Sequence, residues 1–262
     1  MTSKPTLIFV PGAWHTPKYW GKVISTMESK QYKCKPVTLL TTLNKSKDIN
    51  FASDVTHVRD AIKEEISSGQ DVVLVVHSYG GAVGASAIKQ LSRKTASCDE
   101  NKGHVIGLFM VGTGFVAPGM SFLEGIGGKP PPTWDADYEN NTMPIKVDPI
   151  DMLYHDLPKL EAEAWVEKLT EQALTSVTDG YEIAHEGWKD VPVWYIMTTE
   201  DRALPLEVQR LFADTAEKSG ADLTRREIAS SHSPMLSKPE ETSKHLEDAI
   251  EAFTASDAQK KI

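Results

Sequence analysis

Three side chains that together could perform nucleophilic catalysis stand in three separate loops of the sequence. Ser78 follows one apolar run, Asp201 follows another, and His232 comes late in the chain. A serine hydroxyl attacks a carbonyl only when a base takes its proton and a third group orients that base. The order serine, acid, histidine is one known solution on a sheet of parallel strands. We therefore expect Ser78 to be the nucleophile, His232 the base and Asp201 the orienting acid.

Each of these side chains also has a simpler structural interpretation. Ser78 could cap the helix that follows it, which is the commonest role of a serine at that position. Asp201 could cap the next helix, and Glu200 is a neighbouring alternative for the acid. His232 could be an exposed loop histidine. The order of the three residues favours catalysis, and His77 is expected to pack beside the turn rather than act as a base.

The elements that must position these residues alternate along the chain. Short apolar runs predict strands at 7–10, 33–40, 71–76, 105–111, 191–197 and 223–228. Helical spacing predicts helices at 17–27, 51–66, 79–94, 160–174, 206–218 and 239–253, with Ser53 a candidate N-cap of the second. This alternation predicts an α/β fold with about six mostly parallel strands and helices on both faces. The carboxyl ends of such strands meet at one sheet edge, where the three loops are expected to gather.

The alternation is interrupted between residues 115 and 188. This stretch carries a glycine-rich run at 125–128 and prolines at 130–132, and no clear strand. We expect residues 1–114 and 189–262 to form the core, and residues 115–188 to form an inserted, mainly helical cap.

The oxyanion of the tetrahedral intermediate in acyl transfer needs N–H donors. The substrate also needs a pocket lined by side chains. The N–H of Tyr79, at the start of a helix, and the N–H of Ala13, in the turn after the first strand, are the candidate donors. Four side chains are expected to line the pocket: Trp14 and Phe115 beside the catalytic loops, and Tyr154 and Leu157 from the cap.

Composition excludes several classes of protein. The net charge of −9 argues against a nucleic-acid partner, which usually needs a basic face. The sequence has no run of about 18 apolar residues, so no membrane-spanning helix is expected. Residues 1–5, which precede the first predicted strand, are too few for a signal peptide. Cys34 and Cys98 do not make a disulfide framework. We expect a cytoplasmic protein, a monomer or homodimer, that acts on a small molecule without contacting a membrane.

No cofactor or metal is indicated. The glycines at 80–84 lack the Gly-x-Gly-x-x-Gly spacing of a dinucleotide loop, and Gly84 is expected to allow close packing of a helix on a strand. The eight histidines show no metal-ligand spacing.

Four motifs make the reading specific: FVPGAWH at 9–15, VHSYGG at 76–81, TEDRALP at 199–205 and SHSP at 231–234. Together they resemble the α/β-hydrolase superfamily over residues 7–253, and in particular the esterase-like branch of plant methyl esterases and hydroxynitrile lyases with their fungal and bacterial relatives. The resemblance implies Ser78, Asp201 and His232 as the triad. It also implies Ala13 and Tyr79 as the oxyanion-hole donors.

The chain departs from the family pattern at a few positions. Val76 replaces the first glycine of Gly-x-Ser-x-Gly, where a small residue would relieve crowding, and Pro11 stands where many relatives have histidine. The lyases that this branch resembles have a threonine in the turn after the first strand and a lysine directly after the catalytic histidine. Gly12 and Ser233 stand there in this chain, which lowers cyanohydrin cleavage as a candidate.

The expected activity is hydrolysis of a carboxylic ester or lactone of a small to medium apolar molecule, through an acyl-enzyme on Ser78. Two alternatives use the same residues: a small-molecule receptor on this fold, and a lyase or other non-hydrolytic enzyme that stabilises an oxyanion in the same pocket.

Overall fold

Six parallel strands form a single sheet in the computed structural model, which describes residues 4–96 and 102–259. The sheet order is β2-β1-β3-β4-β5-β6. The strands are β1 (Thr6–Val10), β2 (Cys34–Pro36), β3 (Val72–His77), β4 (Val105–Val111), β5 (Val193–Thr198) and β6 (Leu223–Ile228). The predicted α/β fold with about six parallel strands is confirmed. Of the two cysteines, Cys98 lies outside the described residues, and Cys34 is a free thiol.

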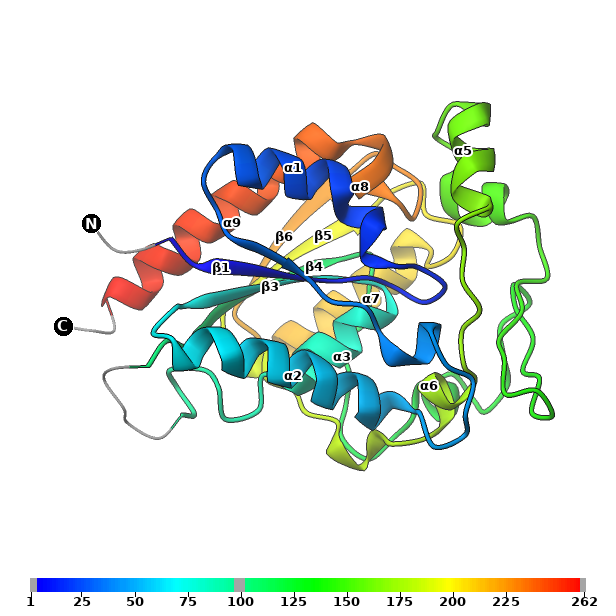
Figure 1. Cartoon of the computed structure of the whole chain (residues 1–262), viewed down its shortest axis with the longest axis horizontal. Helices are drawn as coiled ribbons and strands as arrows, with labels where there is room; N and C mark the ends of the chain where they lie inside the picture. The colour runs from blue at the N-terminus through cyan, green and yellow to red at the C-terminus, as the bar shows by residue number, and fades with distance from the viewer. Residues whose placement is uncertain (1–3, 97–101, 260–262) are drawn as a thin grey trace.

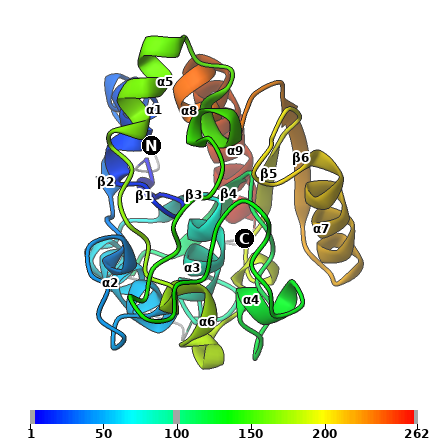
Figure 2. The ribbon, with the colours of Figure 1, turned by 90° about the vertical axis from the view of Figure 1, so that its right-hand side faces the viewer.

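Helices cover both faces of the sheet (Figure 1). One face is covered by α2 (Phe51–Ser67), α3 (Tyr79–Ala87) and α7 (Leu206–Lys218), and the other by α1 (Gly21–Ser29), α8 (Pro234–Ser237) and α9 (Pro239–Gln259). The short helices α4 (Phe122–Gly125), α5 (Lys159–Val166) and α6 (Thr175–Thr178) lie beyond the strand ends (Figure 2). Strand side chains alternate between two cores: Ile8 and Val10 of β1 face α2 and α3, whereas Leu7 and Phe9 face α1 and α9. Because both faces are covered, the inner strands are buried along their whole length and are apolar except at a few end positions such as Thr6, His77 and Thr198.

Two predicted elements are shorter in the structure because side chains or loops capture their backbone groups. The strand predicted at 33–40 ends at Pro36. Beyond it, the Asp54 carboxylate accepts hydrogen bonds from the N–H groups of Leu40 (2.6 Å) and Thr41 (3.2 Å), which turns the chain into a 3₁₀ segment, Leu40–Thr42. The helix predicted at 79–94 ends at Ala87.

The N-cap prediction for α2 was off by three residues. Asn50, not Ser53, is the N-cap; Ser53 lies at the third helical position and completes a reciprocal capping box with Asn50.

Most of the 115–188 segment lies over the carboxyl ends of the strands, on the side that Figure 2 turns toward the viewer, whereas its last residues pack against α3, with Gly187 beside Ala85 and Ile88. Its helices are short, and isolated antiparallel β-bridges, such as that between Trp134 and Ile145, pair the chain between them. The helix predicted at 160–174 stops at Val166. Further along, the segment instead bonds to core loops, with Thr170 N–H donating to the carbonyl of Trp14 (2.8 Å). A small apolar cluster of its own contains Leu123, Trp134, Met143, Leu174 and Val177.

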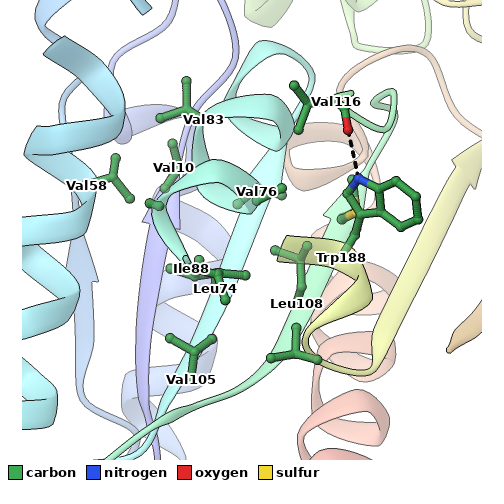
Figure 3. Packing of buried hydrophobic residues seen from close by; sticks show 14 of the residues in the cluster. Val10, Val58, Leu74, Val76, Val83, Ile88, Val105, Leu108, Val116 and Trp188 are labelled. Atoms are coloured by element: carbon green, nitrogen blue, oxygen red, sulfur yellow. Dashed lines mark hydrogen bonds between the residues drawn. The ribbon is translucent and has the colours of Figure 1, made fainter. Parts of the chain in front are cut away.

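Val76, which stands where the family pattern has glycine, fits because Gly84 makes room for it. Val76 is fully buried between β3 and α3, among Leu74, Val83 and Ile88 (Figure 3). A methyl group on Gly84 would lie 2.6 Å from Cγ1 of Val76, closer than packed carbons come. The glycine missing from the strand is therefore replaced by a glycine on the facing helix.

We predict that Gly84→Ala lowers the free energy of unfolding by about 1–3 kcal/mol, the usual effect of overpacking a core. Val76→Ala should recover much of this loss in the double variant, so the two substitutions should be strongly non-additive in urea denaturation. Gly21→Ala is the matched control, since nothing lies within 4 Å of a methyl group there. Additive effects of the two substitutions would contradict this packing account.

Candidate active site

Ser78 occupies a strained turn between β3 and α3. Its φ of 50° and ψ of −126° are rare for a residue with a side chain and cost on the order of 1–3 kcal/mol. Neighbouring groups hold the turn: Ser78 N–H donates to the carbonyl of Val111 (3.1 Å), and its carbonyl accepts from Thr113 Oγ1 (2.6 Å). The hydroxyl makes no capping hydrogen bond to the helix. The helix-cap interpretation of Ser78 is therefore wrong, and the hydroxyl is left for other chemistry.

The loop after β1 packs directly on this turn. A methyl group on Gly12 would lie 2.9 Å from Cβ of Ser78 and 2.8 Å from Nδ1 of His77. A methyl group on Gly80 would lie 2.4 Å from the carbonyl oxygen of Pro11. Glycine at these two positions allows the backbone around Ala13 to approach the serine.

His232 and Asp201 form a buried pair at the same sheet edge. Nδ1 of His232 lies 2.7 Å from Oδ2 of Asp201, which also accepts from Thr198 Oγ1 (2.7 Å). The other carboxylate oxygen accepts the N–H groups of Ala203 and Leu204, each at 2.8 Å. These partners fix the carboxylate, which in turn holds the imidazole in one orientation. The helix-capping role weighed for Asp201 is wrong, because Pro205 is the N-cap of α7 and no side chain caps it. Asp201 instead binds N–H groups of the turn before that helix while it contacts His232.

Glu200, the alternative acid, points elsewhere. It is exposed, and its backbone carbonyl accepts a hydrogen bond from Nε2 of His155 (2.8 Å). Asp201 is the carboxylate that contacts His232.

His77 holds the backbone of His232 through a hydrogen bond. Its Nε2–H donates to the backbone carbonyl of His232 (2.9 Å), and the two rings lie 4.5 Å apart. Since Nε2 carries the proton, Nδ1 is unprotonated, and burial holds the pKa of His77 well below its usual value. His77 is therefore neutral and packed beside the turn.

A second buried histidine, His15, fixes the loop after β1, and the sequence analysis missed it. Its Nδ1 lies 2.7 Å from the carbonyl of Ala13, and its Nε2 lies 2.5 Å from the hydroxyl of Tyr154. A carbonyl only accepts, so Nδ1 donates and Nε2 accepts. Burial lowers the pKa of His15 to about 3, which keeps the ring neutral.

We predict that His15 makes the fold acid-labile. The unfolded histidine takes up a proton near pH 6.5, whereas the folded one resists protonation down to about pH 3. The stabilisation is thus present above pH 6.5 and is lost as the pH falls toward 3. His15→Gln should reduce the loss of unfolding free energy between pH 7 and pH 5 by about 2 kcal/mol, measured by urea denaturation. The exposed His57→Gln is the control; an unchanged pH dependence in both variants would contradict the assignment.

The two candidate oxyanion donors are the backbone N–H groups of Ala13, in the loop after β1, and Tyr79, in the turn after β3. Tyr79 is the first residue of α3, where a helical N–H has no partner within the helix. Within residues 4–96 and 102–259, no hydrogen bond from the N–H of Ala13 or Tyr79 is found. The Tyr79 hydroxyl donates to Asp54 (2.8 Å), and so it is not available to a substrate.

The four predicted pocket residues have different surroundings. Trp14 is half-buried, has a φ of 63°, and donates its Nε1–H to the carbonyl of Met143 (2.8 Å). The Phe115 ring lies edge-on to Trp188 and Tyr195. Tyr154 is fully buried on His15, and Leu157 is half-buried beside the α1–α9 core.

Two searches of the described residues were negative. Across 4–96 and 102–259, no group of three or more histidine, cysteine, aspartate or glutamate side chains could hold a metal ion. No helix in the same ranges has the length and apolar character needed to cross a bilayer.

Comparison with known proteins agrees with this geometry. The alpha/beta hydrolase family model matches residues 7–245. An alpha/beta hydrolase, nvfD, from Aspergillus novofumigatus is 30% identical over 90% of this chain and 93% of its own. Norfluorocurarine synthase 2 from Strychnos nux-vomica is 25% identical, over 95% and 97% of the two chains. The crystal structure of a methylesterase from Arabidopsis superposes with a TM-score of 0.71 at 19% identity, over 94% of this chain and 99% of that one. The resemblance drawn from the four motifs is confirmed, and the chain belongs to the alpha/beta hydrolase family of enzymes.

Proposed function

We propose that this enzyme hydrolyses a carboxylic ester or lactone of a small to medium apolar molecule through an acyl-enzyme on Ser78. The observation that carries the proposal is the His232–Asp201 pair. Nδ1 of His232 is engaged by the carboxylate at 2.7 Å, which leaves Nε2 as the nitrogen able to take a proton. The Arabidopsis methylesterase, named for ester cleavage, supports the same chemistry on this fold.

In the proposed reaction, the Ser78 hydroxyl oxygen attacks the ester carbonyl while Nε2 of His232 accepts the hydroxyl proton. Asp201 stabilises the imidazolium that forms. The N–H groups of Ala13 and Tyr79 bind the oxyanion of the tetrahedral intermediate. The intermediate collapses as the carbon–oxygen bond to the alcohol breaks, and His232 donates its proton to the leaving alcohol. Water, deprotonated by His232, then attacks the carbonyl carbon of the acyl-enzyme. The bond between that carbon and Oγ of Ser78 breaks, His232 returns the proton to Ser78, and the acid leaves.

Two features support hydrolysis over a lyase reaction. The position of Gly12 has no room for the threonine of the lyase pattern, since even a methyl group would crowd His77 and Ser78. Ser233 is fully buried, and its hydroxyl lies 2.6 Å from that of Tyr19. A lysine there would place a charge in a fully buried position, which is costly without a partner of opposite charge.

We further propose that residues 115–188 act as the cap over Ser78, with Trp14, Phe115, Tyr154 and Leu157 shaping the pocket. The position of the segment over the strand ends supports this role. The negative charge supports a small-molecule substrate without a nucleic-acid partner, and we place the enzyme in the cytoplasm.

Turnover of short-chain aryl esters in ¹⁸O-labelled water tests the proposal. A hydrolase incorporates one solvent oxygen into the acid product, and mass spectrometry of the acid should show it. Ligand binding without turnover would favour a receptor, and a product without solvent oxygen would favour a lyase; either result would overturn the proposal.

A further inference from the structure

The loop that carries Ala13 and the side chain of Tyr79 are joined by one buried hydrogen-bond network, which passes through a side chain of the 115–188 segment. That side chain is Gln172, which is 1% exposed. Its Oε1 accepts the backbone N–H of Trp14 (3.2 Å), and its Nε2 donates to Thr41 Oγ1 (2.8 Å). One amide therefore joins the loop after β1 to the loop after β2.

The network continues from Thr41 through Asp54 to the side chain of Tyr79. Thr41 Oγ1 donates to Oδ2 of Asp54 (2.5 Å), and the same oxygen accepts the hydroxyl of Tyr79 (2.8 Å). Asp54 is fully buried, and its second oxygen takes the backbone N–H groups of Leu40 and Thr41. Such a fully bonded carboxylate is rigid, because any movement would leave a buried polar group without a partner.

The peptide between Ala13 and Trp14 is held on both sides. Its carbonyl accepts from Nδ1 of His15, and its N–H donates to Gln172. This bond pair fixes a peptide plane that precedes a residue with a φ of 63°, a conformation that a tryptophan rarely adopts. This plane is joined through Cα of Ala13 to the peptide that carries the Ala13 N–H, and so it restrains the direction of that N–H.

We propose that Gln172 is a positioning residue, which aligns the Ala13 N–H with the Tyr79 N–H and so makes the oxyanion hole depend on docking of the 115–188 segment. The inference rests on the proposed function. Gln172 does not touch the reacting atoms; it acts through Trp14 and Thr41. A misplacement of about 1 Å at a catalytic group can cost on the order of 10²-fold in rate.

The test compares Gln172→Met with the matched control Thr175→Val. Thr175 belongs to the same segment and also bonds to the loop after β2, from Oγ1 to the carbonyl of Ile49 (2.6 Å), but among the described residues it makes no hydrogen bond to Trp14 or Thr41. The readouts are kcat and KM on an aryl ester, and the ratio of kcat/KM for that ester to kcat/KM for its thionoester. Sulfur accepts hydrogen bonds weakly, so this ratio reports on the oxyanion hole.

We expect Gln172→Met to lower kcat about 10- to 100-fold with little change in KM, and to lower the ester-to-thionoester ratio about tenfold. Thr175→Val should keep the wild-type ratio. If Gln172→Met does not fold, Thr41→Val, which removes the next hydroxyl in the network, should lower the ratio in the same direction. A wild-type ratio in the folded variants would overturn the inference. An inactive wild type would instead overturn the proposed function.

Discussion

Ser78→Ala is expected to lower kcat on an aryl ester by at least about 10⁴-fold, because the proposed acyl-enzyme forms on the hydroxyl that this substitution removes. The fold should be unaffected. The Ser78 hydroxyl makes no capping bond, and the backbone bonds to Val111 and Thr113 that hold the turn do not involve it. Steady-state kinetics, with thermal unfolding measured in parallel, would check both statements.

The glycine variant separates strain from chemistry at the same position. Ser78→Gly should be as inactive as Ser78→Ala but more stable, because glycine adopts a φ of 50° without steric cost. Activity of either variant within about tenfold of the wild type would show that Ser78 is not the nucleophile.

Asp201→Asn is expected to lower kcat by about 10²- to 10⁴-fold with the fold intact. The N–H groups of Ala203 and Leu204 bind one carboxylate oxygen and would bind the amide oxygen of asparagine equally well. The amide nitrogen must then face Nδ1 of His232. That arrangement stabilises the tautomer with the proton on Nε2, which cannot accept a proton from Ser78.

Glu200→Gln is the matched control for this variant, since the two carboxylates are adjacent and only their surroundings differ. Glu200 is exposed, whereas Asp201 is 6% exposed. We expect Glu200→Gln to keep kcat within about threefold of the wild type, as for most surface substitutions away from a site. Equal losses in the two variants would remove Asp201 from its assigned role.

The candidate site residues could be predicted from the sequence because each lies in the loop that follows a strand. Strands of a parallel sheet end at a common edge, so the spacing of apolar runs places Ser78, Asp201 and His232 at that edge, and the structure shows the contact between Asp201 and His232. The fold class follows from the same spacing. The motif also indicates crowding at Val76. The residue that makes room for its side chain, Gly84, lies only eight residues away, on the helix that follows.

The parts that could not be predicted depend on contacts between distant segments. Gln172 lies 131 residues from the threonine that it binds, and nothing in its neighbourhood marks it as more than a polar residue. The strand predicted at 33–40 stops early because a carboxylate on α2, that of Asp54, competes for its backbone N–H groups. His15 lies within a motif, but the hydrogen-bond partner of its Nε2, Tyr154, comes from the distant 115–188 segment.

The most direct test of the account is to treat the enzyme with a fluorophosphonate and map the adduct by mass spectrometry. The account predicts one adduct, on the peptide that contains Ser78, lost in Ser78→Ala and formed much more slowly in His232→Ala because the base is absent. Absence of labelling in the folded wild type, or an adduct on another residue, would contradict the claim that Ser78 is an activated nucleophile.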